Sequence, residues 1–111
     1  MTVVSLMCCK NGSLFSCSAE GHSGFAPKGF DIVCAAVSVL MRTTLQVLVD
    51  SYGEIIKSEI TTRGKLAFRV DGVAGQNCDR LIYAADFLRT GLKSLEKEYP
   101  KYISLREQIR D

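Results

Sequence analysis

Residues 21–39 read Gly-His-Ser-Gly-Phe-Ala-Pro-Lys-Gly-Phe-Asp-Ile-Val-Cys-Ala-Ala-Val-Ser-Val, and the rest of the chain is organised around them. This stretch passes from a glycine-rich loop, which holds the only histidine, into the most apolar helical segment of the protein. Asp31 has the residue type and the position of a helix N-cap, because a long apolar run follows it directly. The sequence therefore predicts a helix over residues 31–52, which Gly53 ends.

Cys34 falls in the first turn of this predicted helix. The unpaired N–H groups and the positive dipole end of a helix start favour a thiolate there. His22 precedes a flexible turn that can bring it back to the sulfur, so the two residues are a candidate base and nucleophile. Ser38 lies one helical turn beyond Cys34, where its hydroxyl can line the pocket. Asp31 is assigned to capping, because a carboxylate aimed at the sulfur would oppose a thiolate.

The segments on either side of this stretch predict an α+β fold with the order ββα-ββα. Residues 2–9 and 13–20 alternate around Asn11-Gly12, which indicates a hairpin that ends at His22. Two further strands are predicted over residues 54–62 and 66–71, and a second helix runs from Asn77 as its cap to Glu98. Residues 102–106 fit a short final strand or a further helical turn. The two helices are expected to pack on an antiparallel or mixed sheet within one domain, residues 1–111.

Composition excludes several classes of function. The net charge is only +2, and the 14 basic residues are interspersed with 12 acidic ones, so no nucleic-acid surface is expected. Residues 32–49 are apolar but include Arg42, Gln46 and two threonines, which argues against a membrane span. That helix has almost no polar face, and a helix of this kind must be covered on both sides. A homodimer is therefore expected.

The cysteine pattern fits neither a disulfide framework nor a metal site. The number of cysteines is odd, and they form no CxxC pair. One histidine with scattered thiols makes no standard metal site. The five cysteines are Cys8, Cys9, Cys17, Cys34 and Cys78. Free thiols indicate a reducing compartment, and the N-terminus lacks the basic region of a signal peptide, so a cytoplasmic protein without a cofactor is expected. Cys78 is predicted in the first turn of the second helix, where the dipole argument for Cys34 also holds.

Gly21-His22, followed after a short loop by Asp31-Ile32-Val33-Cys34-Ala35-Ala36 and then Ser38, resembles the ribosomal-processing cysteine protease family Prp. The similarity covers most of the chain, including Tyr99-Pro100-Lys101-Tyr102-Ile103 after the second helix. The resemblance implies a homodimeric protease that removes an N-terminal extension from the twenty-seventh protein of the large ribosomal subunit, cutting after aromatic residues. It implies His22 as base, Cys34 as nucleophile, supporting roles for Gly21, Asp31 and Ser38, and a loop over residues 23–30 that closes on the peptide.

Two other interpretations remain open on the residues alone, because a cysteine near a helix start is more often a packing residue. One is a non-catalytic ribosome-associated or peptide-binding module on the same fold. The other is a redox or acyl-carrier protein that uses Cys34 with Cys17 or Cys78. No residue that orients His22 follows from the sequence; Glu20 and Asn77 are the candidates.

Overall fold

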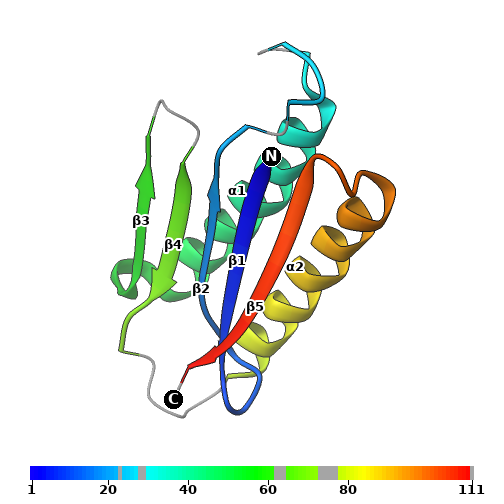
Figure 1. Cartoon of the computed structure of the whole chain (residues 1–111). Helices are drawn as coiled ribbons and strands as arrows, with labels where there is room; N and C mark the ends of the chain where they lie inside the picture. The colour runs from blue at the N-terminus through cyan, green and yellow to red at the C-terminus, as the bar shows by residue number, and fades with distance from the viewer. Residues whose placement is uncertain (23, 28–29, 62–64, 73–77, 111) are drawn as a thin grey trace.

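A five-stranded sheet carries two helices on one face in the computed structural model, which describes residues 1–22, 24–27, 30–61, 65–72 and 78–110 (Figure 1). The elements along the chain are β1 (Thr2–Cys9), β2 (Leu14–Glu20), α1 (Ile32–Tyr52), the short 3-10 helix η1 (Gly53–Ile55), β3 (Ile56–Ile60), β4 (Leu66–Val70), α2 (Asp79–Glu98) and β5 (Ile103–Arg110). The predicted α+β class is confirmed.

The sheet is mixed, with the strand order β3-β4-β2-β1-β5. β1 pairs in parallel with β5, and every other neighbouring pair is antiparallel. Along β1, buried and half-buried residues alternate as a strand covered on one face requires, and Val4, Leu6 and Cys8 belong to the core. Thr2 heads this same core-facing row. The hairpin register pairs Val3 with Glu20, so the end of β2 lies beside the start of β1.

Each helix buries one stripe against the sheet. In α1 the buried residues recur at helical spacing: Val33, Val37, Met41, Thr44, Leu45 and Leu48. In α2 they are Leu81, Ala85, Leu88 and Leu92. Gly91 costs α2 about 1 kcal/mol of helix propensity relative to alanine. The packing of the two helices explains why a glycine stands at this position. A Cβ at Gly91 would lie 3.0 Å from two carbons of Leu40, so the glycine lets the helices approach closely.

The boundaries of three elements differ from the expectation. Residues 53–55 form η1, so β3 begins only at Ile56. α2 begins at Asp79 with Cys78 as its N-cap, which corrects the placing of Cys78 inside the first turn; the proposed cap Asn77 lies outside the described residues. The final segment is a strand, not a helical turn, and it extends to Arg110 because it pairs with the whole of β1. The sequence pattern of this last segment could not show that β1 has a free edge for it to pair with.

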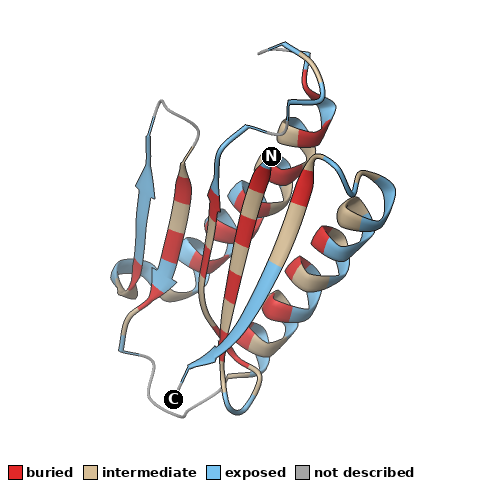
Figure 2. Ribbon diagram, in the orientation of Figure 1, coloured by how far each residue is buried: buried red, intermediate tan, exposed pale blue. Residues whose placement is uncertain are grey.

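By length and composition alone, residues 32–55 would suffice to cross a membrane. In the structure α1 instead packs one side against the sheet, and Met41 at its middle is fully buried. Its other side stays apolar and exposed at Val39, Val47 and Val49. Figure 2 shows the alternation of buried and exposed positions along both helices.

Candidate active site

The start of β1, the end of β2 and the beginning of α1 meet at one end of the molecule (Figure 1). Gly21 makes this approach possible. Its φ is +87°, in the region that favours glycine, and a Cβ there would lie 2.7 Å from the backbone oxygen of Met1. The chain therefore turns at Gly21 against the first residues of β1, and His22 follows directly at the exposed end of β2.

Cys34 is the third residue of α1, at the position predicted for it. Asp31 is the N-cap, and its Oδ1 accepts hydrogen bonds from the amides of Val33 and Cys34, each at 3.0 Å. The Ala35 amide donates to the backbone oxygen of Asp31, also at 3.0 Å. The predicted capping role of Asp31 is confirmed. The amides of Val33, Cys34 and Ala35 are therefore already paired.

Two adjoining cavities flank Cys34. One, of about 460 Å³, is lined by His22, Gly24, Ala26, Asp31, Cys34, Ala35 and Ser38. The other, of about 450 Å³, reaches from Thr2 and Gly21 past His22, Cys34 and Ser38 to Arg42 and the facing ends of β3 and β4. His22, Cys34 and Ser38 stand in the walls of both. The structure therefore brings together all five residues singled out from the sequence.

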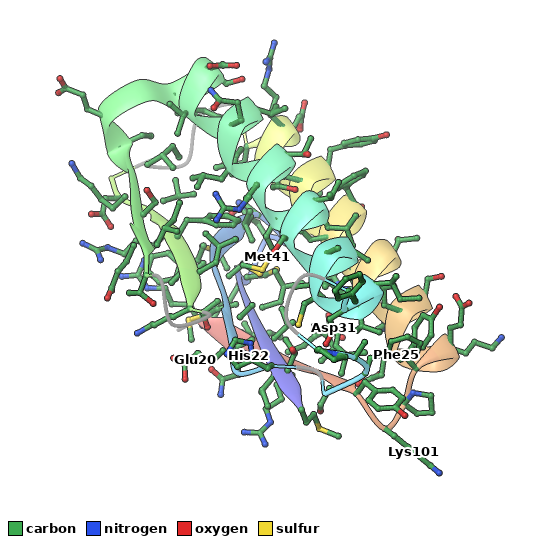
Figure 3. All side chains as sticks on the ribbon, turned by 90° about the horizontal axis from the view of Figure 1, so that it is seen from above. Glu20, His22, Phe25, Asp31, Met41 and Lys101 are labelled. Carbon is green, nitrogen blue, oxygen red and sulfur yellow. The ribbon has the colours of Figure 1, made fainter. Side chains whose placement is uncertain are left out.

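The two candidates for orienting His22 find no support. The contact that the structure gives Glu20 is an ion pair with Lys65, at 3.6 Å between Oε1 and Nζ. Asn77 lies outside the described residues. Figure 3 shows Glu20, His22, Asp31 and Phe25 in that order across the end of the molecule where α1 begins.

Phe25, in the segment between His22 and Cys34, rests on two tyrosines that follow α2. Its ring lies edge-on to Tyr99 at 5.5 Å and to Tyr102 at 5.2 Å, measured between ring centroids. Edge-to-face pairs of this kind contribute about 0.5–1.5 kcal/mol beyond their buried area. Residues 23 and 28–29 of the predicted closing loop lie outside the described residues.

Three further residues of this region were not predicted from the sequence as part of the site. Thr2 is 3% exposed, and its Oγ1 lies 3.9 Å from the Sγ of Cys34. Arg42 and Lys65 line the second cavity. Thr2 did carry a sequence signal, because a hydroxyl heads the otherwise apolar row of β1. Arg42 and Lys65 carried none, since exposed cations on a helix and beside a turn are common.

The other four cysteines are free thiols, and their environments set three of them, Cys8, Cys17 and Cys78, apart from this site. Cys17 is 1% exposed, and burial raises the pKa of its thiol to about 12. Cys8 lies in the core near Arg89, and burial raises the pKa of its thiol although the guanidinium opposes the change. Cys78 caps the start of α2, at the opposite end of the molecule from the start of α1 (Figure 1). Among the described residues, no three His, Cys, Asp or Glu side chains gather as a metal site.

Thiol-dependent hydrolysis of a peptide requires a thiol, a nearby base and room for the peptide. The site offers a thiol at a capped helix start, an imidazole in the walls of the same two cavities, and open space on both sides. The site thus defines the class of a candidate cysteine hydrolase. The family of the cysteine protease Prp matches residues 1–104, so the chain belongs to that family. It is a cysteine-type endopeptidase of a family that processes ribosomal proteins.

Individual relatives agree with the family. The chain is 34% identical over 94 residues to the ribosomal processing cysteine protease Prp of Mycoplasma pneumoniae, covering 85% of this chain and 88% of that protein. Its fold is similar to that of Prp from S. aureus in complex with a covalently linked product peptide, with a TM-score of 0.82, 22% identity, and coverage of 96% of this chain and 99% of that one. A second S. aureus structure, with a substrate peptide, gives a TM-score of 0.76 at 20% identity over the same shares of the two chains.

Proposed function

We propose that His22 and Cys34 are the catalytic pair of this endopeptidase, and that it removes the N-terminal extension of the twenty-seventh protein of the large ribosomal subunit, cutting after aromatic residues. The observation that carries the proposal is that both side chains line both cavities, in a chain of the Prp family. The S. aureus relative, which has been solved with a substrate peptide and with a linked product peptide, supports a peptide as the substrate.

The reaction runs through an acyl-enzyme. The Cys34 thiolate attacks the scissile carbonyl carbon, and the C–N bond breaks as imidazolium His22 gives its proton to the leaving amine. Neutral His22 then takes a proton from water, whose oxygen attacks the thioester, and the thiolate leaves with the acid product released. The two cavities offer room for the peptide on either side of the scissile bond.

The oxyanion needs donors other than the amides of residues 33–35, because these are paired with Asp31. The Ser38 hydroxyl lines both cavities and supplies one such donor in this proposal. Gly21 and Asp31 act indirectly: Gly21 admits the close approach of β1, and Asp31 holds the helix start.

We further infer that residues 1–111 act as one domain in the cytoplasm, without a cofactor, a membrane or bound nucleic acid, and as a homodimer. A cavity of about 480 Å³ lies between α1 and α2, away from the five site residues, and Val47, Tyr83 and Phe87 are among its lining residues. Tyr83 is 74% exposed and Val47 55% exposed. A second copy would cover this surface, since α1 is apolar on the side that its own sheet leaves open.

Cleavage of a short peptide that contains an aromatic pair, followed by mass spectrometry, tests the catalytic assignment. The wild type is expected to cut after the pair, and Cys34→Ala and His22→Ala to lose turnover by at least about a thousandfold. Cys78→Ala, at the other helix start, is the matched control. Cleavage by Cys34→Ala would refute the assigned nucleophile. Binding of the peptide by the wild type without cleavage would favour a non-catalytic module.

A further inference from the structure

We propose that the hydroxyl of Thr2 positions the nucleophile, by donating a hydrogen bond to the Cys34 thiolate and holding its sulfur toward the cavities that His22 shares. This inference rests on the proposed role of Cys34. Thr2 belongs to β1 and Cys34 to α1, so the contact joins the sheet to the first turn of the helix.

The sheet fixes Thr2 firmly. Its amide donates to the backbone oxygen of Tyr102 at 2.9 Å, and it pairs with Ile103 of β5. Thr2 is 3% exposed, and its branched Cβ restricts χ1. The position of the hydroxyl is therefore set before any substrate arrives.

A hydroxyl buried at this position requires a partner. Thr2 heads the row of β1 that continues with Val4 and Leu6 into the apolar core. No buried side-chain nitrogen or oxygen among the described residues lacks a hydrogen-bond partner. The Sγ of Cys34 lies 3.9 Å from Oγ1, within reach of a bond to sulfur. Valine would fit the same space with an apolar methyl group, so packing alone does not require a hydroxyl.

The contact strengthens when the sulfur is charged. A neutral hydroxyl–thiol contact at this length is weak, whereas a thiolate attracts an O–H donor more strongly, and hydrogen bonds that are long in free enzymes shorten in the reacting complex. Thr2 also lines the cavity that contains His22 and Cys34. A sulfur held from the β1 side stays in the wall that both cavities share.

The test compares Thr2→Val, which keeps the shape and removes the hydroxyl, with Thr2→Ser, which keeps the hydroxyl. Thr44→Val is the matched control, because Thr44 is also a buried threonine but its hydroxyl donates to the Leu40 backbone oxygen at 2.7 Å. For each variant, kcat and KM are measured on the aromatic-pair peptide. The rate at which iodoacetamide alkylates Cys34 at pH 7 is read by peptide-resolved mass spectrometry, and circular dichroism confirms the fold.

We expect Thr2→Val to lower kcat and the alkylation rate of Cys34 by about tenfold, with KM within about twofold, since a hydrogen bond to a charged group is lost. Thr2→Ser should restore both rates, and alkylation of Cys78 should not change. If Cys34 in Thr2→Val were alkylated at the wild-type rate, the proposal would be overturned even if kcat fell, because Thr2 would then act on the substrate instead. The alkylation readout needs no cleavage. Activity retained in Cys34→Ala would refute the proposed function separately.

Discussion

The carboxylate of Asp31 accepts the backbone N–H of Cys34 at 3.0 Å, so the residue that begins α1 also fixes the backbone of the candidate nucleophile. The same oxygen accepts the N–H of Val33. Asp31 is 9% exposed, which protects both bonds from competition by water. The helix start and the thiol site are therefore one structural unit, and a change that frays the first turn also displaces the sulfur.

Replacing Asp31 by alanine should lower the free energy of unfolding by about 0.5–2 kcal/mol, the usual value of an N-cap. Turnover should fall as well, because the first turn carries Cys34. Asp31→Ser, which keeps a capping oxygen, should recover most of the stability. Urea denaturation beside peptide cleavage measures both quantities. An Asp31→Ala protein as stable as the wild type would show that the cap contributes nothing.

Gly21 should tolerate alanine far less well than Gly12, although both have positive φ angles, of +87° and +89°. A Cβ at Gly12 meets nothing within 4 Å, whereas a Cβ at Gly21 would lie 2.7 Å from the Met1 oxygen. Gly12→Ala should lose only the conformational cost of about 1–2 kcal/mol. Gly21→Ala should lose more and should also impair cleavage. Equal losses in thermal and urea unfolding would contradict the close approach.

The thiols should react with iodoacetamide in an order that their environments determine. Burial raises the pKa of Cys17 to about 12, so this thiol should stay unmodified in the folded protein at pH 8 and react only on unfolding. Cys17→Ala should leave cleavage intact while lowering stability, because it opens a hole in the core. Tryptic mapping after timed alkylation measures the order. Loss of turnover in Cys17→Ala at full stability would revive a two-cysteine mechanism.

The sequence was most informative where local rules operate. Asp31 capped the helix and Gly53 ended it as predicted, because capping depends on residues only a few positions apart. The position of Gly21 and His22 at the end of β2 also followed, since the predicted hairpin ends at His22. Thr2 could not be assigned to the site in this way. Its contact spans 32 residues and depends on how α1 docks on the sheet, which no local pattern specifies.

The parallel pairing of β5 with β1 was equally out of reach. Local alternation in residues 102–106 fitted a strand but could not identify its neighbour, its direction or its continuation to Arg110. The exposed second half of β5 lacks the apolar alternation that marks a strand, because only its first residues cover the core. The start of α2 was placed one residue early, since asparagine at 77 has the stronger intrinsic preference for a cap.

A charge on the outer surface of the helices should prevent formation of the homodimer proposed above. Tyr83→Arg and Val47→Arg place a cation beside the cavity between α1 and α2, where association would have to bury the charge. Ile109→Arg is the control, because Ile109 is an exposed apolar residue of β5 that does not line this cavity. Sedimentation over a range of concentrations should show a dimer for the wild type and the control only. A monomeric wild type at high micromolar concentration would refute the dimer.

Stability should decrease in acid partly through Glu107. Hydrogen bonding from Arg89 holds the pKa of this carboxyl below its usual range, and Lys93 acts in the same direction. A lowered pKa in the folded state means that this contribution is complete above the unfolded value of about 4.3 and disappears as pH falls through the folded value. Glu107 is partly exposed, so Glu107→Gln should cost less than about 1 kcal/mol at pH 7. The difference in Tm between wild type and variant should shrink as pH falls below about 4.3, and it should also shrink at pH 7 in about 1 M salt, which screens the pair. A difference that persists unchanged at pH 3 would assign the role of Glu107 to packing instead of charge.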